Sequence, residues 1–134
     1  MDTKKTILAI IASGFVYLIA SEAFGLITQA IMPFDWTSVG GMRSFDDPIM
    51  ILFFLYGFVS AIGAVVLYQF INLKGNTNQK GAKFGAMMWL ATSVPSAFVI
   101  LTTMTYPAGF FLNELVFGFF IWVLMGITIA FVLR

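Results

Sequence analysis

Residues 49–73 read IMILFFLYGFVSAIGAVVLYQFINL and contain no charged side chain. A helix needs about 20 predominantly apolar residues to cross the roughly 30 Å hydrocarbon core of a bilayer. Because lipid offers no hydrogen-bond partners, the backbone of such a run must pair within its own segment, and the run is too long for a barrel strand. The stretch therefore predicts a membrane-spanning helix.

Three further runs have the same character, at about residues 6–32, 84–106 and 110–133. Their only charged side chains are Glu22 and Glu114. Across the chain 60% of the residues are hydrophobic and 10% are charged, whereas an average soluble domain has about 45–50% and about 25%. We therefore expect an all-α fold, a four-transmembrane-helix antiparallel bundle.

The connections and their charges predict an orientation for this single domain, residues 1–134. The expected outer loop is residues 33–48, and the expected cytoplasmic loop is residues 74–83. Basic residues are retained on the cytoplasmic side. All of them except Arg43 fall on one side of a four-span topology, namely Lys4, Lys5, Lys74, Lys80, Lys83 and Arg134. Both termini are thus expected inside.

Small side chains recur at helical spacing in all four runs. Helices in lipid associate by close packing, so small residues at this spacing indicate contact faces. The expected packing positions are Gly14, Ser21, Gly25, Gly57, Ala61, Gly85, Gly118 and Gly126. We interpret them as ordinary helix contacts, because a pore or substrate pathway needs a more continuous polar lining.

Glu22 is the most informative side chain, because a carboxylate so far inside a span costs on the order of 2.5–3.5 kcal/mol to insert. Such residues are as a rule functional or paired. One interpretation is a proton or cation site, with Gln29 further along the same face. The other is a polar clasp that joins the first helix to Thr92, Ser93 or Ser96 of the third. The lack of a second ionisable group favours the clasp.

Glu114 is expected in the first turn of the fourth helix, where the helix dipole favours an anion. The alternative is that Asn113 and Glu114 join Gln29 in an outward-facing polar pocket. Both membrane carboxylates, Glu22 and Glu114, belong to the outer half of the expected topology.

The chain has no cysteine and no histidine. Their absence removes thiolate and imidazole ligands, so we expect no metal site and no cofactor. No nucleotide-binding glycine motif, catalytic triad or pair of catalytic carboxylates occurs, and we expect no catalytic residues and no enzymatic activity. The seven Lys and Arg form no basic stripe, which argues against nucleic-acid binding.

A longer pattern runs through the second half of the chain. It consists of Gly81-Ala82-Lys83-Phe84-Gly85, Trp89, Pro95, Tyr106-Pro107, Gly118 and Leu124-Met125-Gly126-Ile127. In these residues the chain resembles a broad group of small prokaryotic four-helix integral membrane proteins of unknown function. The resemblance implies the four-helix fold and a multi-pass location in a prokaryotic cytoplasmic (inner) membrane, and it implies no activity.

A shorter pattern, Ala20-Ser21-Glu22-Ala23-Phe24-Gly25, surrounds the first membrane carboxylate. It is similar to the Ala-Glu-x-x-Gly surroundings of the membrane glutamate in small multidrug resistance exporters. Those exporters have tight loops, whereas this chain has a long acidic loop at residues 33–48. The resemblance implies transport that uses Glu22.

The absence of a complete site and the many Phe residues favour a non-catalytic role. We expect a structural or accessory subunit of a larger membrane complex, whose partners are the lipid bilayer and other membrane protein subunits or itself. The alternative is a proton-coupled transporter of small solutes or cations that uses Glu22.

Overall fold

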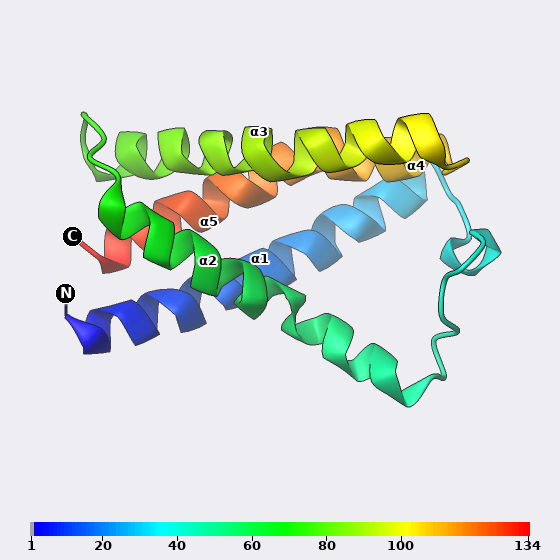
Figure 1. Ribbon diagram of the computed structural model, residues 1–134, viewed down its shortest axis with the longest axis horizontal. Coiled ribbons are helices and arrows are strands. Elements are labelled where there is room, and N and C mark those ends of the chain that lie inside the picture. The colour runs from blue at the N-terminus through cyan, green and yellow to red at the C-terminus, as the bar shows by residue number, and fades with distance from the viewer. Residues whose placement is uncertain (1) are drawn as a thin grey trace.

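The computed structural model describes residues 2–134, with the backbone only at Trp36, and those residues form helices and no strand. The first span is α1 (Thr3–Ile31), the second is η2 (Pro48–Leu55) with α2 (Tyr56–Phe70), the third is α3 (Thr77–Thr103), and the fourth is α4 (Ala108–Phe111), η3 (Leu112–Phe117) and α5 (Gly118–Val132). Successive spans run in alternating directions (Figure 1). The all-α antiparallel four-helix bundle is confirmed.

All four spans are long and apolar enough to cross a membrane. The chain is a multi-pass membrane protein. Both termini and the connection between α2 and α3 lie at one end of the bundle, which we call the terminal end (Figure 1). The loop after α1 and the turn after α3 lie at the other end. The assignment of the terminal end to the cytoplasm stays a prediction.

The spans are not equivalent in their packing, because α5 occupies the centre. The third span packs mainly on α5, α1 packs on α5 and on α2, and α2 has its main contact with α1. The buried core lies where these helices meet, around Val65, Phe84, Met125 and Ile129. The neighbour order across the bundle is therefore α3, α5, α1, α2.

Glycines bring the backbones of α3 and α5 into contact. A Cβ atom at Gly81 would lie 2.5 Å from the Cα of Ile127 and 2.7 Å from the carbonyl oxygen of Gly126. A Cβ at Gly85 would meet the carbonyl of Trp122, and one at Gly126 would meet the carbonyl of Gly81. Only glycine permits this approach, which lets the two helices pack without intervening side chains.

A second glycine contact joins α1 to α2. A Cβ at Gly57 would lie 2.8 Å from the carbonyl oxygen of Gly14, and one at Gly14 would meet the ring of Phe58. Ala61, one turn further along α2, is fully buried. Gly25 does not have the packing role expected for it, because nothing lies within 4 Å of a Cβ built there.

The other small positions take part in packing to differing degrees. Ser21 is half-buried. Gly118 is buried, but a Cβ there would make only ordinary contacts, 3.6 Å from the Ser93 hydroxyl and from the Asn113 carbonyl. The small residues of α1 therefore contact α2 near Gly14, but this contact does not extend to Gly25.

The third span begins earlier than the sequence indicates. The expected cytoplasmic loop 74–83 is reduced to residues 71–76, because Asn76 caps α3. Its side chain accepts the backbone N–H of Gln79 at 2.9 Å, and the Gln79 side chain accepts the backbone N–H of Asn76 at 3.2 Å. This reciprocal capping box satisfies the first free N–H groups of the helix, so the polar residues that follow are helical.

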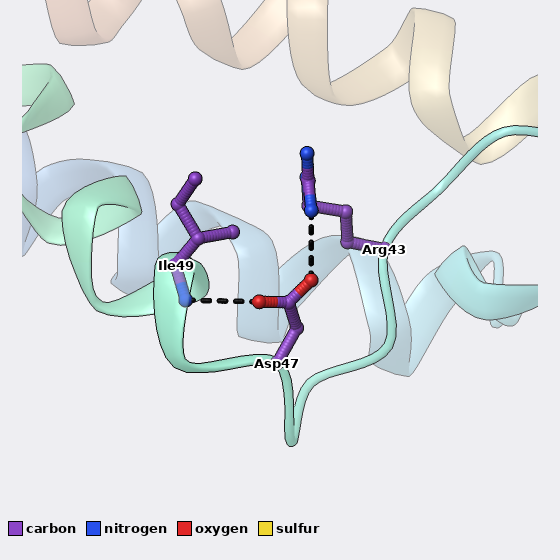
Figure 2. Close-up of polar contacts among 3 residues, drawn as sticks. All are labelled: Arg43, Asp47 and Ile49. Carbon is purple, nitrogen blue, oxygen red and sulfur yellow. Dashed lines mark hydrogen bonds and ion pairs between the residues drawn. The ribbon is translucent and has the colours of Figure 1, made fainter.

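The first eight residues of the second span, η2, form a 3₁₀-helix rather than an α-helix. Asp47 starts it by accepting the Ile49 backbone N–H at 3.0 Å and the Arg43 guanidinium at 2.8 Å (Figure 2). These two bonds, the backbone bond first, hold the pKa of Asp47 below its usual value. None of the η2 side chains is buried, and η2 runs away from α1 and α3 (Figure 1).

Candidate functional site

Glu22 lies on the outside of the bundle. Its side chain is exposed, and within residues 2–134 it has no hydrogen bond and no ion pair. It precedes Ile31, the last residue of α1, by nine residues, or about 13.5 Å along the axis. That distance is close to half of the roughly 30 Å hydrocarbon core. The structure therefore leaves a carboxyl group near mid-membrane without a partner in the part of the chain it describes.

The expected clasp between Glu22 and the third helix is not formed. Thr92 and Ser96 are exposed on α3, and the Thr92 hydroxyl donates to the Met88 carbonyl of its own helix at 2.7 Å. The physical reason is the neighbour order, because α5 rather than α1 is the main partner of α3. Sequence periodicity identifies the small and polar stripes, but it does not say which helices become neighbours.

The Gln29 side chain contacts the loop that follows the first span and does not lie in a site with Glu22. Its side-chain amide donates to the Phe34 carbonyl at 3.0 Å and accepts the Phe34 N–H at 3.2 Å. The amide thus mimics a backbone partner and fixes the loop that follows α1. Both of these hydrogen bonds are structural, and neither points to a ligand.

Asn113 and Glu114 do not lie in an ordinary first helical turn. Both belong to η3, a π-helical segment between α4 and α5. Such wide turns are rare and often lie at functional sites. The Trp89 indole N–H donates to the carbonyl of Leu115 inside this segment at 3.0 Å, so a side chain from α3 supports the irregular backbone.

Asn113 reaches the first span, but at Thr28 rather than at Gln29. The Thr28 hydroxyl lies 3.2 Å from the Asn113 Oδ1 atom and 2.9 Å from the carbonyl of Phe24. Thr28 is almost fully buried and Asn113 is half-buried. The expected polar pocket of Gln29, Asn113 and Glu114 is therefore divided, with Gln29 turned toward the loop and Asn113 turned toward α1.

Glu114 faces the interior of the bundle. It is half-buried, and its carboxyl group lies close to the hydroxyl of Ser93 on α3. Ser93 also accepts the indole N–H of Trp122 on α5 at 3.2 Å. Ser93 and Trp122 are both buried, so this serine links the carboxyl group to the centre of the bundle.

Aromatic rings extend this link to the first two spans. The Tyr17 ring packs edge-on against Trp122 at 5.4 Å and against Tyr56 at 5.5 Å between ring centroids. The hydroxyls of Tyr17 and Tyr56 lie near each other. We call Tyr17, Tyr56, Ser93, Glu114 and Trp122 the interior polar cluster. It draws one side chain from each of α1, α2, α3, η3 and α5.

The sequence pattern does not indicate this cluster, although it points to Glu114. Ser93 was expected only as a partner of Glu22, and the two tyrosines and Trp122 are not part of any polar pattern in the sequence.

Among residues 2–134 no three His, Cys, Asp or Glu side chains lie close enough to hold a metal ion. No protein-family model, curated protein or solved structure matches the chain.

Proposed function

We propose that the chain is a non-catalytic subunit of a larger membrane assembly, joined to its partner through the Glu22 face of α1. This face consists of Phe15, Ile19, Glu22 and Leu26, which are spaced i, i+4, i+7 and i+11 along one side of the helix. All four side chains are exposed, with Ile19 at 66% and Leu26 at 74%. The single observation that carries the proposal is the outward carboxyl group among them.

Intramembrane ionisable residues almost always face a protein interior or a water-filled cavity, because hydrocarbon solvates them poorly. Glu22 does not face the interior of its own bundle. A partner helix laid on this face would enclose the carboxyl group and supply the hydrogen bonds it lacks. The large apolar side chains on either side of it would be buried in the same contact.

The partner is expected to be a different protein that carries a basic residue near mid-membrane. Within the described residues, the basic side chains in the helices lie in the first two turns of α1 and α3, namely Lys4, Lys5, Lys80 and Lys83. A second copy would therefore bring another carboxyl group to the same depth, and like charges there repel. A Lys, Arg or His from another chain would pair with Glu22.

Site-specific photo-crosslinking in native membranes tests this assignment. A photoreactive residue at position 26 should crosslink to a second membrane protein, at a span with a basic side chain. The matched control is position 90, because Leu90 is also exposed, at 60%, but lies on α3. Introducing Glu22→Leu should remove the crosslink from position 26 and leave any crosslink from position 90. Crosslinks from position 26 to lipid alone, or to a second copy, would reject the proposal.

For the cellular setting we propose a prokaryotic cytoplasmic membrane with both termini inside. The support is the distribution of basic residues and the resemblance to small prokaryotic four-helix proteins. Attaching a reporter that is active only in the cytoplasm to either terminus, and to the loop around residue 40, tests the orientation. Activity at both termini and none at the loop is the expected result.

The interior polar cluster favours a second candidate, proton-coupled transport of a small solute or cation with Glu114 in place of Glu22 as the titrating acid. Glu114 lies on a π-helical segment, faces Ser93 and is linked to four of the helical segments. In liposomes that contain the purified chain, Glu114→Gln should abolish flux and the matched variant Glu22→Gln should retain it. A parent protein without flux would remove this candidate.

A further inference from the structure

A cavity of about 210 Å³ opens at the terminal end of the bundle. Three separate segments line it: the end of α2 with the residues that follow, the start of α3, and the end of α5. Its polar lining comes from Tyr68, Asn72, Thr77, Lys80 and Arg134, and its remaining walls are aliphatic. A concave site with convergent polar groups is the usual form of a ligand site.

The charge around this cavity is strongly positive. Six of the seven basic residues lie at the terminal end, and the only acidic side chain there is Asp2. The Asp2 carboxylate accepts the backbone N–H groups of Lys4 and Lys5, so it is turned toward α1. In the described part of the chain neither Lys80 nor Arg134 has a carboxylate partner.

The neighbouring cations are held in other ways. Lys83 donates to the backbone carbonyl of Lys74 at 3.0 Å, and Lys5 donates to the backbone carbonyl of Arg134 at 2.9 Å. The Arg134 guanidinium lies 4.7 Å from the centroid of the Phe131 ring. None of these contacts involves a side-chain carboxylate, and no Asp or Glu is among the residues that line the cavity, which present two cations, a phenol, an amide and a hydroxyl.

We propose that this cavity binds the phosphate group of an anionic lipid. Phosphate matches a set of donors that combines a guanidinium, an ammonium and neutral hydrogen-bond donors. A lipid is the source favoured by position, because the cavity lies where the spans end and combines its two cations with the aliphatic side chains of Ile71, Leu73 and Leu133. Basic pockets between helix ends are known to select anionic headgroups.

The orientation rule alone does not account for this arrangement. It predicts basic residues on the cytoplasmic side but gives no reason for two of them to line one cavity from different spans. Lys4 and Lys74 lie at the same end and do not line it. They provide a matched control with the same loss of charge.

Lipid binding to the full chain in detergent tests the proposal, with vesicle-derived phosphatidylglycerol, phosphatidylcholine and inorganic phosphate as separate probes and native mass spectrometry as the readout. Phosphatidylglycerol should be retained in preference to phosphatidylcholine. The double variant Lys80→Gln with Arg134→Gln should bind it about tenfold more weakly or worse, while Lys4→Gln with Lys74→Gln should bind it as the parent does. Circular dichroism should report the same helix content in both variants.

Three results would overturn the proposal. An equal loss in both double variants would show a general attraction to positive charge rather than a site. Equal binding of the two lipids would show that the net negative charge of the headgroup, which phosphatidylcholine lacks, is not recognised. Displacement of phosphatidylglycerol by millimolar inorganic phosphate would assign the cavity to the free anion instead of a lipid. Each result is independent of whether a protein partner occupies the Glu22 face.

Discussion

The two outer spans of this bundle are attached to its centre in different ways. On one side α3 meets α5 backbone to backbone, with Gly81 and Gly85 opposite Gly126. On the other side the second span meets α1 at one crossing, between Gly57 and Gly14, and then departs as η2, whose side chains are not buried. Both attachments use glycine, but only on α3 do glycines at successive turns contact the partner backbone.

The difference shows that a small-residue stripe fixes a contact only where the partner backbone follows it. The spacing of Gly81 and Gly85 matches one helical turn, so both face α5 together. Gly14 and Gly25 are further apart, and the partner of α1 has left before Gly25 is reached. The half of the molecule opposite the terminal end consequently exposes more of α1 and of η2, and Glu22 lies in that half.

The largest expected effect is on the α3–α5 contact. Gly126→Leu places a side chain where the Gly81 carbonyl and the Gly85 backbone now lie, so the helices must separate. We expect a loss of about 3 kcal/mol in the free energy of unfolding, measured by denaturing-detergent titration of the purified protein. Gly25→Leu is the control, because nothing lies within 4 Å of its Cβ position. Similar losses in both variants would contradict the assigned contact.

A smaller effect is expected at the α1–α2 crossing, where two glycines of the same helix can be compared. A Cβ at Gly57 would lie 2.8 Å from the Gly14 carbonyl oxygen, whereas one at Gly63 meets nothing within 4 Å. Gly57→Ala should therefore cost about 1–2 kcal/mol. Gly63→Ala should stabilise the helix by about 0.5–1 kcal/mol through its higher helix propensity. The same titration measures both, and a loss at Gly63 equal to that at Gly57 would remove the distinction.

The hydrogen bond between Trp122 and Ser93 should contribute less to the free energy of unfolding than either glycine contact. Trp122→Phe removes the indole N–H and should cost about 1 kcal/mol for the bond, in addition to the packing lost with the smaller ring. A double-mutant cycle with Ser93→Ala separates the two, because the bond contributes only when both partners are present. Coupling close to zero would mean that this bond does not link α3 to α5.

The smallest expected effect concerns Asp47, in the exposed loop before η2. Its pKa lies below the ordinary 3.8, first because of the Ile49 N–H and second because of Arg43. A carboxyl group with a lowered pKa stabilises the folded state above the ordinary pKa, and this contribution is lost as the pH falls through the lowered value. The start of η2 should therefore loosen only at a pH below about 4.

Replacing Arg43 separates the two causes. In Arg43→Gln the pKa of Asp47 should rise but stay below 3.8, because the backbone hydrogen bond remains. Titration of the Asp47 carboxyl carbon by NMR measures both the parent and the variant. A return to the ordinary value in Arg43→Gln would show that the ion pair, and not the helix start, lowers the pKa.

Much of the fold could be predicted from the sequence, because hydrocarbon imposes a simple length rule on each span. The positions of the four spans follow from that rule, and the observed bounds differ by a few residues except where Asn76 starts α3 early. The neighbour order could not be predicted in the same way. It depends on which glycine stripes meet, and several stripes on different helices have similar spacing.

The candidate site was predicted less well for the same reason. Glu114 and Asn113 were identified from their chemistry, but their π-helical backbone has no signature in the residues that form it. Tyr17 and Trp122 are apolar in pattern and polar only in their single hydroxyl or N–H. Glu22 lies well inside the first span, as its sequence position indicates, yet its outward direction required knowing that α1 and α3 are not main partners.

The central position of α5 also sets an order for biogenesis. As the chain emerges from the ribosome, α1 and α2 can associate through Gly14 and Gly57 once both are inserted. The main contact face of α3 has its partner in α5, so before α5 is made α3 meets the earlier spans chiefly where the rings of Tyr68 and Phe84 pack together. Synthesis of residues 108–134 therefore supplies the principal partner of α3, and a ribosome stalled before them leaves that face of α3 exposed to lipid.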